Sequence, residues 1–90
     1  MSTGVELIAA ERKRQITEEG YDAEHDLNGD YQLAMAGASY ALPAAERRAA
    51  AVPATWPWLS RFWKPTPDDR VRELTKAGAL IAAAIDSLIA

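Results

Sequence analysis

Alanine is the residue that most limits how this chain can fold. It accounts for 19 of the 90 residues, as many as valine, isoleucine, leucine, methionine and phenylalanine together. Alanine favours helices and lets them approach closely, but each buried alanine removes little apolar surface from water. A chain of this length with few large aliphatic side chains has difficulty reaching stability alone. We therefore expect one small all-α domain of three to four helices, spanning residues 1–90, that assembles as a homo-oligomer.

Composition and charge exclude several classes of protein. The chain holds no cysteine, which excludes disulfide scaffolds and cysteine-ligated zinc. It has no apolar run long enough for a membrane span, and its first residues lack the features of a signal peptide. The net charge of −3 argues against duplex nucleic acid as a partner, because such binding needs a broad basic face. We expect a cytoplasmic protein.

Apolar periodicity and capping residues predict the first two helices. The first covers residues 5–19, where Thr3 can form a capping box with Glu6. The second covers residues 30–41 and is followed by Pro43, with a short further helix expected over residues 44–51. The second helix carries a stripe of small residues that lets a neighbouring helix approach closely: Leu33, Ala34, Gly37, Ala38 and Ala41.

The last predicted helix is the clearest in the sequence and covers residues 67–89. Thr66 is expected to cap it, and Pro67 is expected at its first position. Its large apolar residues alternate three and four apart, which is typical of a helix-packing seam. We expect two or more chains to pack through this seam, which comprises Val71, Leu74, Gly78, Ile81, Ile85 and Leu88.

Residues 53–67, here called the tryptophan segment, interrupt this helical pattern. They hold all three tryptophans, the only phenylalanine and four of the five prolines, so we expect a loop. In an alanine-rich core, tryptophan can simply supply bulk. The alternative is a site, because aromatic rings interleaved with cations can stack a nucleobase and neutralise its phosphates. The residues that support a site are Trp56, Trp58, Arg61, Phe62, Trp63 and Lys64.

Further candidate residues lie on the first and last predicted helices. Arg12 and Gln15 share one helix face, and Arg14 lies on another. These side chains either form solvated pairs with neighbouring glutamates, or Arg12 packs inward and requires an acidic or phosphate partner. Lys76 lies midway along the most apolar helix, and we expect its side chain to point into a polar cleft.

The only histidine, His25, lies in a polar loop beside Asp26. A lone loop histidine is most often exposed, and a metal role would need loop carboxylates such as Asp22 and Asp30. General acid–base work by His25 with Asp26 is equally unspecific. The sequence holds no glycine-rich phosphate loop and no nucleophile elbow. We expect no metal, no cofactor and no catalytic residue.

Several motifs together resemble a widespread set of small phage and prophage proteins. They are ERxRQ at 11–15, EGY at 19–21, HD at 25–26, RELxKAGALI at 72–81 and ID at 85–86. The WPW and WKP elements of the tryptophan segment are similar to one branch of that set. The resemblance covers most of the chain except residues 43–54, and its specificity comes from the order of the motifs.

Some members of this group resemble anti-CBASS sponges, which are oligomeric phage proteins. They bind the cyclic nucleotide signals of bacterial immunity in the host cytoplasm and withhold them from the effector. The resemblance implies that this chain sequesters a cyclic dinucleotide or related signal as a dimer or tetramer, without cleaving it. The expected ligand-binding residues are Arg12, Arg14, Gln15, Tyr21, His25, Trp56, Trp58, Trp63, Lys64 and Lys76. Aromatic rings would stack on bases, cations would meet phosphates, and Gln15 and His25 would donate hydrogen bonds.

Two other functions remain open. The chain is also similar to the all-α nucleotide pyrophosphohydrolases typified by MazG, which hold Mg²⁺ with paired carboxylates on successive helices. It departs from their motif, because Glu19 and Asp22 flank Gly20 and the residue three after Glu73 is Lys76. The third alternative is a module whose tryptophan segment docks on a host protein.

Overall fold

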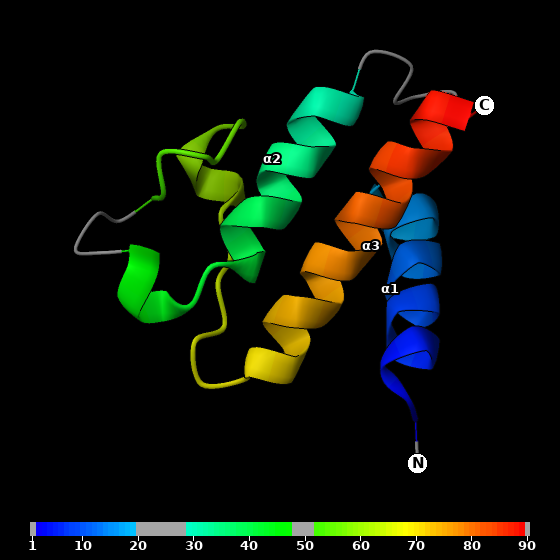
Figure 1. The fold of residues 1–90 in the computed structure, drawn as a ribbon, viewed down its shortest axis with the longest axis horizontal. Helices are drawn as coiled ribbons and strands as arrows, with labels where there is room; N and C mark the ends of the chain where they lie inside the picture. The colour runs from blue at the N-terminus through cyan, green and yellow to red at the C-terminus, as the bar shows by residue number, and fades with distance from the viewer. Residues whose placement is uncertain (1, 20–28, 48–51, 90) are drawn as a thin grey trace.

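The protein folds into helices joined by irregular segments (Figure 1). The computed structural model describes residues 2–19, 29–47 and 52–89. Within these ranges there is no strand, so the predicted all-α class is confirmed. The elements are α1 (Gly4–Glu19), α2 (Asp30–Ala41), the 3₁₀ turns η1 (Ala44–Arg47) and η2 (Ser60–Phe62), and α3 (Arg70–Ile89).

The two long predicted helices begin in different ways. At α1 the predicted capping box forms, since the Thr3 N–H donates to Glu6 and the Glu6 N–H donates to the Thr3 hydroxyl, at 2.9 and 3.3 Å. The prediction that Thr66 caps α3 is wrong. The Asp69 carboxylate accepts the Arg72 N–H at 3.0 Å, because a turn closed by the Asp69 N–H and the Thr66 carbonyl places Pro67 before the helix.

Elsewhere the predicted boundaries hold where they can be compared. Helix α2 spans the predicted residues 30–41, and α1 starts one residue before the predicted 5–19. Of the short helix expected over 44–51, residues 44–47 form the 3₁₀ turn η1, and the remainder lies outside the described residues. The described part of the tryptophan segment contains only the three-residue turn η2.

Helix α3 is the central element and packs against both other helices (Figure 1). A glycine lies at each of these two helix–helix contacts. A Cβ at Gly37 of α2 would lie 3.2 Å from the Ala77 carbonyl oxygen, and a Cβ at Gly78 of α3 would lie 2.5 Å from Cδ1 of Ile8. Both positions therefore depend on the missing side chain for the close approach of two helices.

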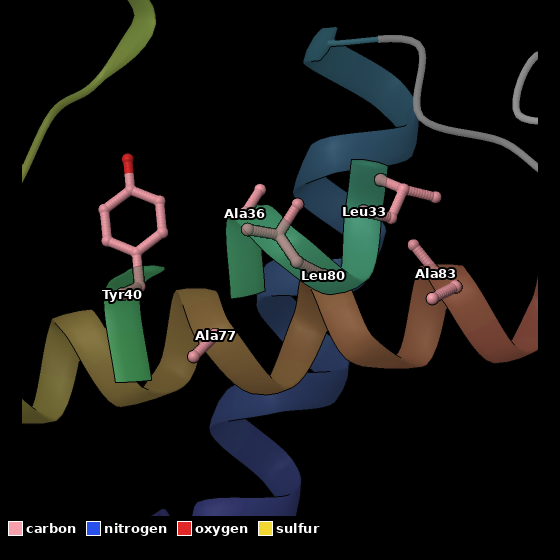
Figure 2. Close-up of a cluster of buried hydrophobic side chains, with 7 residues drawn as sticks. Leu33, Ala36, Tyr40, Ala77, Leu80 and Ala83 are labelled. Atoms are coloured by element: carbon pink, nitrogen blue, oxygen red, sulfur yellow. The ribbon is translucent and has the colours of Figure 1, made fainter. Parts of the chain in front are cut away.

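The buried core lies between α2 and α3 and is built mainly from alanine (Figure 2). Leu33 and Leu80 are its large aliphatic members, exposed by 1% and 3%. All three tryptophans pack against this core as partly buried rings. Among the described residues, the buried cluster consists of Leu33, Ala36, Tyr40, Ala77, Leu80, Ala83 and Ala84.

The faces that pack differ from those predicted by periodicity. In α2, Leu33 and Gly37 are buried as expected, but Ala34 and Ala38 are exposed, and Ala36 and Tyr40 face α3 instead. In α3 the alanine-rich face packs against α2, because small side chains let the backbones approach. The predicted seam is left largely exposed, with Val71, Leu74, Ile81, Ile85 and Leu88 between 44% and 68% exposed.

None of the described helices combines the length and the apolar character that crossing a bilayer requires.

Candidate functional site

A cavity of about 240 Å³ lies where the three helices meet the tryptophan segment. Helix α1 contributes side chains one turn apart, and α3 contributes a row at four-residue spacing, so each helix presents one face to the cavity. The described residues that line it include four cations, one carboxylate and four aromatic rings. The lining residues are Glu11, Arg14, Gln15, Tyr40, Trp56, Trp58, Phe62, Lys64, Arg72, Lys76 and Leu80.

Of the ten predicted site residues, the structure describes eight, and the cavity brings six of these together. These six come from α1, the tryptophan segment and α3, which are far apart in the chain: Arg14, Gln15, Trp56, Trp58, Lys64 and Lys76. Sequence reasoning did not assign Glu11, Tyr40, Arg72 or Leu80 to the site. Glu11 had a usable signal, because it lies three and four residues before Arg14 and Gln15. Tyr40 had none.

Arg12 lies away from the cavity. Its guanidinium is 3.2 Å from the Asp86 carboxylate of α3, and Arg12 is 9% exposed. The expectation that Arg12 packs inward and takes an acidic partner is confirmed. Arg12 was also predicted to bind the ligand, but it is not among the residues that line the cavity.

Trp63 also lies outside the cavity lining and packs in the core. Its ring is 4.7 Å from that of Tyr40, and the Arg47 guanidinium lies 5.3 Å from its centroid. Trp63 therefore supplies the bulk that an alanine-rich core lacks. The two remaining predicted site residues, Tyr21 and His25, fall outside the described residues.

Hydrogen bonds hold the tryptophan segment against α2. The Ser39 and Thr55 hydroxyls are 2.6 Å apart, and the Lys64 N–H donates to the Tyr40 hydroxyl at 3.2 Å. The Trp58 indole N–H donates to Gln32 at 3.3 Å. These contacts fix Trp58 by its edge and leave it partly exposed at the cavity.

The carboxylate of Glu11 organises the α1 side of the cavity. It accepts hydrogen bonds from Arg14 at 2.8 and 3.0 Å, from Arg72 at 2.6 Å and from the Gln15 amide at 3.3 Å. Burial alone would raise the pKa of Glu11, but the hydrogen bonds and charges of the two arginines outweigh burial and lower that pKa below its ordinary 4.5. Glu11 thus holds two cations at the cavity.

A second buried carboxylate, Glu73, holds the tryptophan segment and α2 against α3. It accepts hydrogen bonds from Arg47 at 2.7 Å, from Arg70 at 3.1 Å and from the Thr66 N–H at 3.1 Å. Arg70 also donates to the carbonyls of residues 40–42, at the end of α2. Burial alone would raise the pKa of Glu73, but the arginine contacts and the Thr66 hydrogen bond outweigh burial and lower that pKa below its ordinary 4.5.

These two carboxylates predict loss of stability in acid. Each has a folded-state pKa below the ordinary 4.5, so each stabilises the fold above pH 4.5, and that stability is lost as the pH falls through the folded-state value. We expect the urea midpoint to be nearly constant from pH 8 to about pH 5 and to decrease steeply below about pH 4.5. Equal midpoints at pH 7 and pH 3 would contradict this expectation.

The Gln15 amide has a defined orientation. Because a carboxylate only accepts hydrogen bonds, the Gln15 nitrogen faces Glu11 and its carbonyl oxygen Oε1 is turned away. Gln15 is 2% exposed, and no donor in the described part of the chain reaches Oε1. Oε1 is therefore an acceptor without a donor, and donation by Gln15 to a ligand stays a prediction, because Nε2 carries a second hydrogen.

Two lysines, Lys64 and Lys76, also line the cavity. Lys76 Nζ donates to the Lys64 carbonyl at 3.0 Å and lies 5.3 Å from the centroid of the Tyr40 ring. No carboxylate of residues 2–19, 29–47 or 52–89 forms an ion pair with Lys64, which is exposed. A ligand anion beside Lys64 would therefore meet a positive charge that no described carboxylate neutralises.

The described residues contain no group of three or more histidine, aspartate or glutamate side chains arranged to hold a metal ion. The chain matches no protein-family model, no curated protein sequence and no solved structure.

Proposed function

We propose that this protein is a nucleotide-binding sponge, which holds an anionic nucleotide in the cavity and withholds it without cleaving it. One observation carries the proposal. In a chain of net charge −3, the described lining of one cavity includes four cations and four aromatic rings beside one carboxylate. This lining fits a ligand that combines a flat aromatic ring with negative charge.

The aromatic and cationic groups support different parts of such a ligand. Trp58 and Phe62 expose ring surface on which a base can stack, and such stacking contributes about 1–3 kcal/mol per base. Lys64 and Lys76 supply charge-assisted hydrogen bonds to phosphate oxygens. Arg14 and Arg72 are already engaged by Glu11, so their fork geometry is held in place before the ligand arrives.

The engagement of the carboxylates supports binding rather than hydrolysis. Metal-dependent nucleotide hydrolysis requires carboxylates that can coordinate Mg²⁺. Glu11 and Glu73, which are both buried, each accept hydrogen bonds from two arginines. Coordinating a cation would mean displacing those partners.

A cyclic dinucleotide is the proposed ligand class, bound by more than one copy of the chain. The cavity of about 240 Å³ is smaller than the roughly 300–1,000 Å³ of typical small-molecule sites, which suits one base with its phosphate. A two-fold symmetric dimer would offer two such cavities to the two halves of a cyclic dinucleotide. On the basis of the resemblance to anti-CBASS proteins, the proposed role is phage evasion of bacterial immunity in the cytoplasm of the host.

Binding is tested with cyclic dinucleotides, mononucleotides and nucleoside triphosphates by calorimetry and thermal shift, with Mg²⁺ and with EDTA. We expect at least one ligand to raise Tm without metal and to be recovered intact by chromatography. Lys64→Gln is expected to weaken binding about tenfold or more, and Trp58→Ala about tenfold to a hundredfold. Lys13→Gln, an exposed lysine of α1 outside the cavity, is the matched control.

Three results would contradict the proposal. Recovery of a cleaved product only with Mg²⁺ would make the protein a hydrolase. Equal weakening by Lys64→Gln and Lys13→Gln would place the ligand outside the cavity. The absence of any response to the whole panel would favour a protein partner for the tryptophan segment.

The proposed oligomer is tested through the exposed seam of α3. Because Ile85 and Leu88 are 53% and 68% exposed, charges there should leave the protomer folded and disrupt only an interface. Light scattering is expected to give a mass of two or more chains of 9.8 kDa for the natural protein, and one chain for Ile85→Glu/Leu88→Glu. An unchanged mass in this variant would place the interface elsewhere, and a monomeric natural protein would contradict the oligomer.

A further inference from the structure

The α1 side of the cavity carries an unusual group, a buried acceptor that lacks a donor. Gln15 lines the cavity at 2% exposure, and its Oε1 has no donor within reach in the described chain. A buried carbonyl oxygen without a partner is costly, and native proteins seldom leave one. The amide cannot relieve this by rotating, because its oxygen would then face the Glu11 carboxylate.

A ligand can satisfy this atom only by presenting an N–H or O–H group. A phosphate oxygen at Gln15 would set acceptor against acceptor beside the Glu11 carboxylate. In the proposed binding mode the phosphate therefore lies beside Lys64, and the base lies beside Gln15. This reasoning rests on the proposed binding of a nucleotide.

We propose that Gln15 is a specificity-determining residue that accepts a hydrogen bond from the exocyclic amino group of the bound base. The cavity then favours bases such as adenine and cytosine over their counterparts with oxygen at the same position. In hypoxanthine and uracil an acceptor oxygen replaces the amino group and would face Gln15 Oε1. The aromatic rings and cations of the cavity would bind the two bases of each pair with equal affinity, so they would not contribute to this preference.

The test compares two matched pairs of mononucleotides by calorimetry: AMP with IMP, and CMP with UMP. The natural protein is expected to bind the amino member of each pair about tenfold to a hundredfold more tightly. Purine riboside 5′-monophosphate, which has hydrogen in place of the amino group, should also bind more weakly than AMP.

Two variants separate specificity from affinity. Gln15→Met keeps the approximate volume but removes the acceptor, so the AMP-to-IMP ratio should fall to about one. Lys64→Gln should weaken both members of each pair and leave the ratio unchanged. The Tm of each variant without ligand shows whether it remains folded, and for Gln15→Met the loss of an unsatisfied polar atom offsets the lost hydrogen bond to Glu11.

The outcomes distinguish this inference from the proposed function. Nucleotide binding with no preference within the pairs, or with a preference that Gln15→Met retains, overturns the role of Gln15 and leaves the nucleotide site standing. If Gln15→Met does not fold, the purine riboside comparison with the natural protein decides alone, and equal affinities for it and AMP overturn the role. Failure of every nucleotide to bind overturns both.

Discussion

Replacing Glu73 with glutamine is expected to lower the free energy of unfolding by about 3–5 kcal/mol, because it removes one partner of a buried charge cluster. The Glu73 side chain is 1% exposed and that of Arg47 is 8% exposed. Glutamine keeps the shape of the side chain but removes the charge, so the Arg47 and Arg70 guanidiniums lose their shared counter-ion. A small domain has a total stability of roughly 5–15 kcal/mol, so the loss is a large fraction of it.

The measurement is urea denaturation followed by tryptophan fluorescence, with Glu46→Gln as the control. Glu46 lies exposed in η1, so the same chemical change there should alter the free energy of unfolding by no more than about 0.5 kcal/mol. Because Arg47 also lies over the Trp63 ring, the emission of folded Glu73→Gln is expected to shift as well. Coincident unfolding curves for the two variants would show that the Glu73 cluster does not stabilise the fold.

Leu33→Ala is the second substitution with a large expected effect, a loss of about 2–5 kcal/mol. Leu33 is 1% exposed and is packed among small residues that include Ala36 and Ala83. Alanine neighbours have no side-chain freedom with which to fill the space, so the cavity left by the removed atoms should persist. The cost of such a substitution increases with the volume of the cavity that remains.

Leu59→Ala is the matched control, because Leu59 is 62% exposed and uses only its backbone carbonyl to hold the Trp56 indole. Urea denaturation should show little change for this variant, within about 0.5 kcal/mol. A similar, small effect at both leucines would mean that Leu33 is not the centre of the core.

The cavity shows how far the sequence could be used to predict a site. The interleaved aromatic and cationic residues predicted Trp56, Trp58 and Lys64 as site residues, because this pattern can be recognised within nine residues of the sequence. The same reasoning could not separate Trp58, which lines the cavity, from Trp63, which packs on Tyr40. Both have the same intrinsic chemistry, and only the position of α2 decides which ring is covered.

The boundaries of α1 and α2 and the cap of α1, but not the cap of α3, followed from the sequence alone, because they depend on interactions within a few residues. The Thr3–Glu6 capping box and the span of α2 are examples. The choice of buried face was decided only by the tertiary structure. Periodicity favoured the large aliphatic residues of α3, but α2 packs on its alanine face, where the backbones can approach closely.

The ion pairs also divide into those that the sequence can predict and those that depend on the tertiary structure. The contact between Glu11 and Arg14 lies within one turn of α1, so helix spacing alone could have predicted it. The contacts of Arg72 with Glu11 and of Arg47 with Glu73 join residues that are 61 and 26 positions apart, so helix spacing does not predict them. The sequence by itself thus determined an all-α chain with a segment suited to stacking and charge. The tertiary structure decided which of these groups share a cavity, because burial and ion pairing depend on packing between distant segments.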